Sequence, residues 1–175
     1  MKSVTSSESC SRCRGCCRFE KEDAYATILA RPELDKIREK LGSIPKLKEF
    51  RGSGKVFQVQ LIKSAKGDCY ICPFLDEEKS SCRIYELRPL ECRIWPFMLA
   101  RSRDGKRVNL VCLDKRDCPS YEKVSPQEFE GHKRLVLRAV KSGEIIGFIR
   151  KFPELIWDHE PYSFPVEEIK ELKKC

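Results

Sequence analysis

The sequence predicts an α+β fold, as a small single domain with cysteine-rich metal-binding loops, a few short strands and about three helices. Cysteines and prolines recur at irregular intervals between residues 67 and 98, which is typical of loops wrapped around a metal site. Two short segments alternate apolar and polar residues, as half-buried strands do. Other segments repeat apolar residues at helical spacing, and one of them begins with a helix-capping pattern.

The first half of the chain contains one predicted helix and one predicted strand. Pro32 suits the first turn of a helix, apolar residues recur at every third or fourth position after it, and Gly42 can end it. Residues 57–61 alternate apolar residues with glutamines and predict a strand. Residues 67–98, which hold most of the later cysteines, predict loops and short elements.

The second half begins with a strand predicted at residues 108–112, where apolar residues alternate again. A helix is predicted after Ser125, because this residue is a natural N-cap and Glu128 completes a capping box. We expect Gly143 to end that helix. Residues 165–174 predict a last short helix.

The length of 175 residues fits one domain, or one domain with a small appendage. The positions of the cysteines predict a metal-binding region over residues 1–120. Residues 121–175 predict a helical C-terminal extension that packs on this region.

The net charge of +8 comes from 35 basic and 27 acidic residues, which are interleaved along nearly the whole chain. Blocks of about five or six like charges, which mark many nucleic-acid-binding tails, do not occur. This pattern favours a mixed-charge surface over a nucleic-acid interface. Arg12, Arg14 and Arg18 surround the first cysteines, and they would suit an acidic redox partner protein.

The N-terminus contains no apolar stretch like that of a signal peptide, and no segment approaches the roughly eighteen apolar residues of a membrane-spanning helix. We therefore expect a cytoplasmic protein without a membrane span. Clustered cysteines in that compartment are metal ligands or catalytic groups more often than disulfides. The odd number of 11 cysteines also does not suit complete pairing.

The spacing of the cysteines is the strongest functional signal in the sequence. A C-x2-C-x2-C-C run, a C-x2-C pair and two further cysteines occupy Cys10, Cys13, Cys16 and Cys17, then Cys69 and Cys72, then Cys82 and Cys92. Thiolates two residues apart on a tight turn can bind one ion, which is why this spacing recurs in zinc and iron–sulfur sites. The C-x2-C-x2-C triple is like that of bacterial ferredoxins, in which a remote cysteine followed by proline is a further ligand. Cys72 and Cys118 are both followed by proline.

The number of cysteines exceeds the four thiolates of one zinc site, so two zinc sites, two clusters, or one of each are all compatible with the count. Cys112, on a predicted strand, and Cys175, the last residue, are expected to lie outside any metal site. The predicted metal ligands are Cys10, Cys13, Cys16, Cys17, Cys69, Cys72, Cys82, Cys92 and Cys118.

Two arginines, Arg88 and Arg93, flank Cys92. They either donate hydrogen bonds to the metal-bound sulfur atoms or form ion pairs with Glu86 and Glu91.

The sequence predicts no catalytic residues. His132 and His159 lack ligand spacing, and His132 lies on the apolar side of the helix predicted after Ser125, so we expect it to pack against the core. Phosphate-binding glycine loops and hydrolase motifs are absent from the sequence.

Beyond the first cysteine run, the later cysteines come with a characteristic context of Ile-Tyr-Glu, Arg-Pro and Cys-Arg-x-x-Pro. The matching stretches are Cys10 to Cys17, Gly67 to Asp76, Cys82 to Pro89, Cys92 to Phe97, and Asp117-Cys118-Pro119. Together they resemble the CxxCxxCC family, the YkgJ-like group of cysteine-cluster domains that is described as zinc- or iron-chelating and often labelled as iron–sulfur proteins. The resemblance covers roughly residues 10–119.

The resemblance implies a metal-binding protein that holds a [4Fe–4S] cluster for redox or cluster-dependent chemistry. One alternative is a zinc-stabilised binding module for protein or nucleic acid, which the basic charge and the surplus of cysteines allow. Another is a methyltransferase-like enzyme, because flagellin lysine N-methylases share the cysteine domain. Whether the chain is an enzyme is therefore left open by the sequence.

Overall fold

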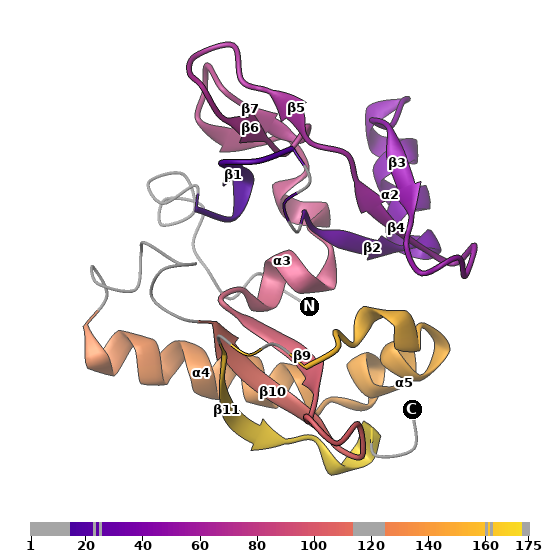
Figure 1. Ribbon diagram of the computed structural model, residues 1–175, viewed down its shortest axis with the longest axis vertical. Coiled ribbons are helices and arrows are strands. Elements are labelled where there is room, and N and C mark those ends of the chain that lie inside the picture. Colours follow the sequence, from indigo (N-terminus) through magenta and orange to yellow (C-terminus); the bar gives the residue numbers. More distant parts are fainter. Residues whose placement is uncertain are drawn as a thin grey trace. The chain divides into compact units, whose positions relative to one another are not determined.

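The computed structural model describes residues 15–22, 24, 26–113, 125–159, 161 and 163–172. The chain divides into two compact units, which meet in sequence between Arg93 and Ile94 (Figure 1). Each unit combines small antiparallel sheets with helices, which confirms the predicted α+β class. The boundary predicted at residues 120 and 121 lies outside the described residues and stays a prediction.

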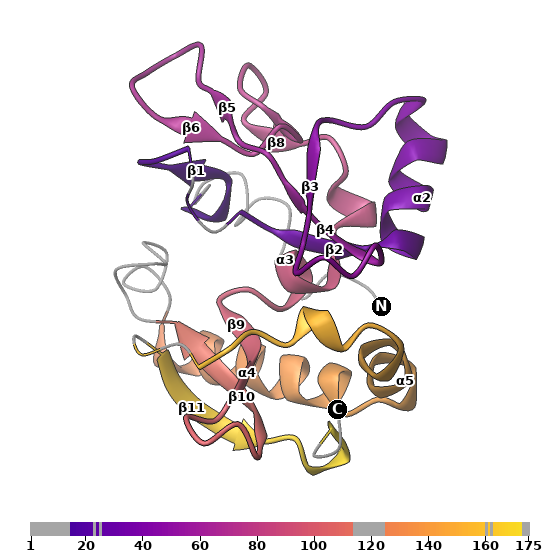
Figure 2. The ribbon, with the colours of Figure 1, turned by 45° about the vertical axis from the view of Figure 1, so that its right-hand side comes forward.

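The described part of the N-terminal unit contains three small antiparallel sheets (Figures 1 and 2). Their strands, in sheet order, are β2 (Ile28–Ala30), β4 (Val56–Val59) and β3 (Leu47–Glu49); β1 (Arg18–Phe19), β6 (Tyr70–Ile71) and β5 (Ile62–Lys63); and β7 (Leu75–Asp76) with β8 (Ser81–Cys82). The strand predicted at residues 57–61 is confirmed in part, because β4 ends at Val59. Most of these strands have only two or three residues, so tertiary contacts rather than strand propensity must hold them in place.

Helix α2 (Arg31–Leu41) confirms the helix predicted after Pro32. The main-chain N–H of Ala30 donates to the Glu33 carboxylate at 3.0 Å, which caps the start of the helix. Gly42 ends it with a φ of 72°, a left-handed conformation that glycine adopts without steric cost.

Three shorter helical segments lie in or at the end of this unit. They are η1 (Gly15–Cys17), η2 (Tyr85–Leu87) and α3 (Leu90–Ile94). Both η1 and α3 carry predicted metal ligands, so their placement determines where those thiols lie.

The core of the N-terminal unit includes cysteines. Its buried residues are Ala26, Leu29, Leu34, Ile37, Val59, Leu61, Cys72, Phe74 and Ile84. Cys17 and Cys82 are partly buried and pack against the same cluster. The cysteine-rich loops are therefore part of the hydrophobic core rather than an appendage to it.

The described part of the C-terminal unit contains one antiparallel sheet and two longer helices (Figure 1). The strands, in sheet order, are β11 (Ser163–Glu168), β10 (Val108–Leu113) and β9 (Phe97–Arg101), and the helical segments are α4 (Pro126–Val140), α5 (Gly143–Lys151), η4 (Pro153–Leu155) and η5 (Lys170–Leu172). Strand β10 confirms the strand predicted at residues 108–112.

Helix α4 begins as predicted but ends earlier. Ser125 Oγ accepts a hydrogen bond from the main-chain N–H of Glu128 at 3.3 Å, and the Glu128 carboxylate accepts one from the N–H of Ser125 at 2.9 Å. The helix stops at Val140, and Gly143 is the first residue of α5 rather than a terminator. Ser142 explains the difference, because its hydroxyl accepts from the N–H of Ile145 and caps a new helix.

The prediction of a last helix over residues 165–174 is wrong for the residues up to Glu168, which belong to strand β11. This segment pairs with β10, with Phe164 opposite Cys112 and Glu167 opposite Leu110. Pairing between segments so far apart in the sequence is invisible to a local periodicity. Only the short η5 segment of the predicted helix is helical, and residues 173–174 lie outside the described residues.

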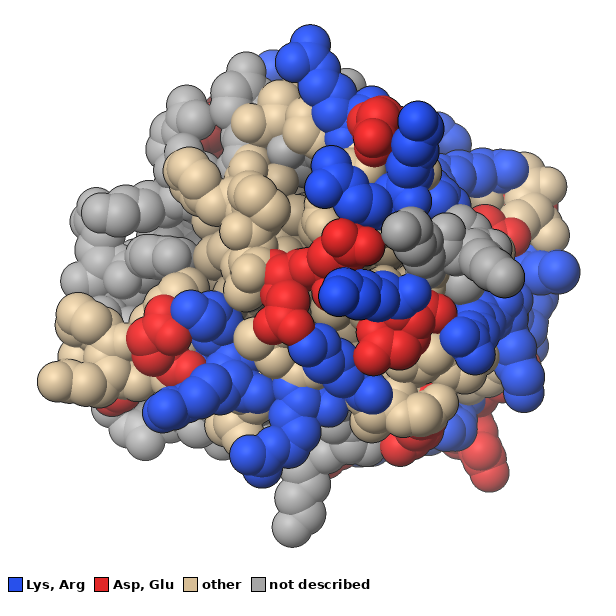
Figure 3. Space-filling model, turned by 90° about the horizontal axis from the view of Figure 1, so that it is seen from below, with Lys and Arg blue, Asp and Glu red and all other residues tan. Residues whose placement is uncertain are grey.

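The charged side chains do not form a single basic patch on the face that Figure 3 shows, where basic and acidic groups are interleaved. Ion pairs between basic and acidic side chains include Lys133 with Glu130, at 2.6 Å, and Lys141 with Glu167. Among the described residues, no helix is long and apolar enough to cross a membrane.

Candidate metal centre

Cysteines from the beginning and the middle of the N-terminal unit come together at its core. The main-chain N–H of Cys72 donates to the main-chain oxygen of Cys17 at 3.0 Å, next to the pairing of β1 with β6. Cys72 is 8% exposed, and Cys17 packs against the same buried cluster. Two C-x2-C-containing motifs that are distant in sequence therefore meet through the main chain as well as through their side chains.

A tight turn and a hairpin bring Cys82 to the same cluster. The N–H of Leu75 donates to the oxygen of Cys72 at 2.9 Å, which closes the turn that contains Pro73. Strand β7 then pairs with β8 so that Leu75 lies opposite Cys82. The hairpin thus returns the chain to the neighbourhood of Cys72.

Cys92 reaches the cluster from helix α3. Its Sγ donates a hydrogen bond to Thr27 Oγ1 at 3.2 Å, and Thr27 Oγ1 donates to Glu91 Oε2 at 3.0 Å. Glu91 Oε2 also accepts from the N–H of Ile28 at 2.8 Å. The helix that carries Cys92 is therefore tied to strand β2.

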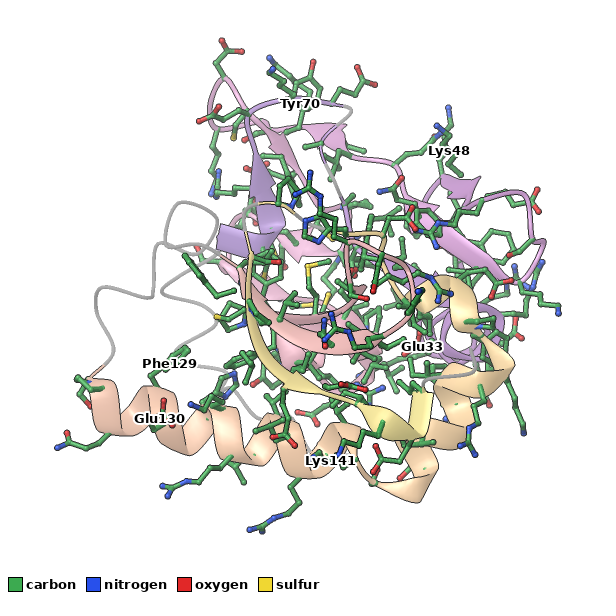
Figure 4. All side chains as sticks on the ribbon, turned by 60° about the horizontal axis from the view of Figure 1, so that its bottom comes forward. Glu33, Lys48, Tyr70, Phe129, Glu130 and Lys141 are labelled. Carbon is green, nitrogen blue, oxygen red and sulfur yellow. The ribbon has the colours of Figure 1, made fainter. Side chains whose placement is uncertain are left out.

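Glu33, whose side chain is labelled in Figure 4, connects helix α3 to the β2–α2 segment a second time. Besides the N–H of Ala30, its carboxylate accepts from the N–H of Leu90 at 2.7 Å and pairs with Arg93 at 3.4 Å. Burial raises the pKa of Glu33, and these three donors offset part of that rise. The Glu33 carboxylate thus joins the start of α3 to the end of β2.

The electrostatics show that the buried thiols influence one another. Burial, with a smaller contribution from negative charge on Cys82 and Cys16, raises the pKa of Cys72 to about 12. Burial also raises the pKa of Cys92 well above its ordinary value, with Cys16 and Cys72 contributing. These thiols cannot ionise together unless a positive charge compensates them, and a bound metal cation supplies such a charge.

The Cys17 thiol belongs to the same electrostatic group. Its hydrogen bond with Cys16 lowers the pKa, but burial and the charges of Cys72, Cys92 and Cys82 outweigh that effect and raise it. Cys16, Cys17, Cys72, Cys82 and Cys92 therefore form one group of interacting thiols, which we call the thiol cluster.

The other predicted ligands have different positions. Cys69 is partly buried at the start of β6, and its Sγ accepts a hydrogen bond from Arg18 Nη1 at 3.6 Å. Cys10, Cys13 and Cys118 lie outside the described residues. Cys112, which was expected to lie outside any metal site, is buried on β10 in the C-terminal unit.

The model of the CxxCxxCC family, a "putative zinc- or iron-chelating domain", matches residues 9–119 of this chain. The chain belongs to this family. The match covers more than half of the 175 residues and contains every predicted ligand. No curated protein and no solved structure matches the chain.

The thiol cluster fits the soft metals that the CxxCxxCC family is described as chelating, because zinc and iron–sulfur clusters both bind thiolates. Cys17, Cys69, Cys72 and Cys92 are free thiols rather than disulfides. Within the residues that the structure describes, no three His, Cys, Asp or Glu side chains are already spaced to hold one ion. Metal binding therefore requires the first two cysteines of the run, a local rearrangement of the thiol cluster, or both.

Sequence reasoning missed the polar residues around Cys92. Glu91 was considered only as one possible partner of the flanking arginines, and its contacts with the Thr27 hydroxyl and the N–H of Ile28 were not anticipated. Arg93 pairs with Glu33, which no local pattern connected with the cysteines. The sequence indicated these contacts only by placing a carboxylate next to Cys92. The residues that Glu91 and Arg93 contact lie far away in the sequence.

The flanking residue Arg88 is buried, and its guanidinium stacks on the ring of Tyr85 at 4.1 Å.

His132 packs against the core of the C-terminal unit, as predicted. Its Nε2 lies 3.1 Å from the main-chain oxygen of Trp95, and its ring lies 5.6 Å from that of Phe97.

Proposed function

We propose that the chain binds a [4Fe–4S] cluster through the cysteines of its C-x2-C-containing motifs and uses it for redox or cluster-dependent chemistry. The observation that supports this most is that buried and partly buried thiols from four separate segments influence one another electrostatically at one core. Such a cluster takes four thiolate ligands. The candidates are the thiol cluster together with Cys10 and Cys13.

The spacing of the first run favours a cluster over a single zinc ion. Cys10, Cys13 and Cys16 have the three-ligand spacing of ferredoxins, and Cys72 is followed by Pro73 as the remote ligand is in those proteins. Membership in a zinc- or iron-chelating family is compatible with this choice. Cys69 and Cys118 are the next candidates in this proposal.

The chain's own residues would set the environment of the bound group. When bound, a cluster of this kind supplies a one-electron carrier whose potential depends on charge and solvent exposure. The apolar side chains around Cys72 exclude water from one side of the thiol cluster. Arg83 hydrogen-bonds the main-chain oxygen of Pro73, and its charge lowers the pKa of Cys72, so it favours the thiolate form of that ligand.

An acidic redox partner protein is the partner that this proposal favours. Arg18 lies next to Cys17 in sequence, contacts Cys69, and its side chain is 31% exposed. Exposed positive charge near a redox centre steers a negatively charged partner to it.

The decisive experiment is purification without oxygen, followed by measurement of iron, zinc and acid-labile sulfide per chain. We expect roughly four irons and four sulfides per chain, a brown protein with absorbance near ~400 nm, and reversible bleaching by dithionite. Air should destroy the chromophore, because clusters near solvent are oxidised. A colourless protein with stoichiometric zinc and no sulfide would overturn the cluster and favour the zinc-stabilised module.

A further inference from the structure

The hydroxyl of Thr27 lies between a predicted ligand and a carboxylate. It is within hydrogen-bond distance of Cys92 Sγ, at 3.2 Å, and of Glu91 Oε2, at 3.0 Å. A hydroxyl has one proton to donate and can accept as well. With Cys92 protonated, the thiol donates to Thr27 and Thr27 donates to Glu91.

The position of Thr27 is held by the main chain around it. Its main-chain oxygen accepts from the N–H of Val59 at 3.2 Å, next to the pairing of β2 with β4. Ile28, the next residue, donates its N–H to Glu91 at 2.8 Å. The hydroxyl therefore belongs to the residue just before strand β2, and the place of that strand relative to Glu91 does not depend on the hydroxyl itself.

Helix α3, which carries Cys92, is held to the same strand by a second carboxylate. Glu33 accepts from the N–H of Ala30 at the end of β2 and from the N–H of Leu90 at the start of α3, at 3.0 and 2.7 Å. Two carboxylates thus fix the helix, Glu91 through Thr27 and the N–H of Ile28, and Glu33 through the N–H groups of Ala30 and Leu90. Among the residues in these contacts, Thr27 is the one whose side chain is hydrogen-bonded to the Cys92 sulfur.

We propose that Thr27 is the positioning residue of Cys92, and that in the metal-bound protein its hydroxyl donates a hydrogen bond to the Cys92 sulfur. A metal-bound cysteine is a thiolate, so it has no proton to give and becomes an acceptor. The Thr27 hydroxyl then turns from Glu91 to Sγ, while Glu91 keeps the N–H of Ile28. The proton that Cys92 loses goes to solvent, and Thr27 keeps its own.

This inference rests on the proposed function in one respect, namely that Cys92 is a ligand. A hydrogen bond to a ligating sulfur draws charge away from it and fixes its direction, and such partners of ligands influence both metal affinity and redox potential. The effect should therefore be seen in the spectrum of the bound centre, which a purely structural role for Thr27 would leave unchanged.

The test compares the wild-type protein, prepared without oxygen with its native metal, with Thr27→Val and Thr27→Ser. Valine has the shape of threonine without the hydroxyl, and serine restores the hydroxyl. We expect Thr27→Val to lose metal to a chelator about ten-fold faster and to shift its sulfur-to-metal charge-transfer absorption, and Thr27→Ser to return both toward wild type. Ser102→Ala is the matched control, because it also removes a hydroxyl that donates to a carboxylate, Asp104, but in the C-terminal unit.

The outcomes separate the two proposals. If the wild-type protein holds no metal, the proposed function and this inference both fail. If the wild type holds metal and Thr27→Val matches it in metal loss and spectrum, only the inference is overturned. If Thr27→Val does not fold, Thr27→Ala, which also lacks the hydroxyl, replaces it: faster metal loss and a displaced charge-transfer band in Thr27→Ala but not in Thr27→Ser support the hydroxyl contact, whereas equal behaviour of the two variants contradicts it.

Discussion

The main-chain N–H of Cys72 donates to the main-chain oxygen of Cys17, so the two cysteine motifs are joined by a backbone hydrogen bond of 3.0 Å. The bond extends the pairing of β1 with β6, in which Arg18 lies opposite Ile71. Because this contact involves no side chain, it brings the motifs together even when the cysteines carry no metal. The ligands are thus partly preorganised by the fold.

The thiol cluster should be distinguishable from the other buried cysteine by mutation. Cys72→Ser should remove more than half of the bound metal, because serine is a poor ligand for soft metals. Cys112→Ala is the control, since Cys112 is equally buried but lies on β10 of the C-terminal unit. Metal per chain, measured on purified protein, checks this. Loss of metal in Cys112→Ala with retention in Cys72→Ser would contradict the assignment, and Cys175→Ser should have no effect.

Removal of metal should loosen the N-terminal unit more than the C-terminal one. Compensating charge is lost from the buried thiols, and metal-binding free energy in such sites contributes to folding. After treatment with a chelator, trypsin should cleave between residues 15 and 93 faster than in the holoprotein, while helices α4 and α5 serve as an internal reference. Mass spectrometry of the fragments gives the cleavage sites. Equal resistance with and without metal would argue against a structural role for the metal.

Cys69 and Cys72 should differ in reactivity in the metal-free protein, although they belong to one C-x2-C pair. Cys69 is partly exposed beside Arg18, whereas burial raises the pKa of Cys72 to about 12 and keeps its thiol protonated at pH 8. Because the thiolate is the nucleophile, iodoacetamide should label Cys69 at least about ten-fold faster. Faster labelling of Cys72 would refute this prediction.

The capping box of α4 should contribute measurably to stability. Ser125→Ala removes the acceptor for the N–H of Glu128 and should lower the free energy of unfolding by about 1 kcal/mol. Chemical denaturation of the metal-loaded protein checks this value. Ser142→Ala, at the start of α5, should cost a similar amount or less, because its hydroxyl accepts from Ile145 at 3.3 Å and no glutamate completes a box there. If Ser125→Ala left the free energy of unfolding unchanged, other contacts would determine the start of α4.

His132 should make stability depend on pH. Burial lowers the pKa of His132 below its ordinary value of 6.5, although its hydrogen bond to the Trp95 oxygen offsets part of this. Below pH 6.5, His132 is therefore protonated more readily in the unfolded chain than in the folded protein. The free energy of unfolding falls as the pH drops from 6.5 toward the pKa of His132 in the folded protein. The free energy of unfolding should fall more steeply between pH 7.5 and 5.5 (roughly one unit either side of a histidine pKa) in the wild type than in His132→Gln. His159→Gln, at an exposed position, is the control and should keep the wild-type slope.

Local sequence patterns were sufficient where a structure depends on neighbouring residues. The capping box of Ser125 and Glu128 predicted the start of α4, and Pro32 and Gly42 bracketed α2 closely. The same kind of reasoning failed at Gly143, where a second serine cap begins a new helix, and at residues 165–168, where pairing with β10 imposes a strand. Caps and turns act over a few residues, whereas strand pairing depends on a partner elsewhere in the chain.

The sequence by itself determined the chemistry of this protein: thiols at metal-binding spacing, in a context specific enough to indicate the CxxCxxCC family. Only the tertiary structure decided which thiols share a core, that Cys69 lies beside Arg18, and that Thr27, Glu33 and Glu91 surround the helix of Cys92. Spacing describes neighbours along the chain, and it specifies the kind of ligand. The burial and hydrogen bonds that control those ligands arise between segments that meet only on folding, because the chain must bury its apolar residues and satisfy its buried polar groups at the same time.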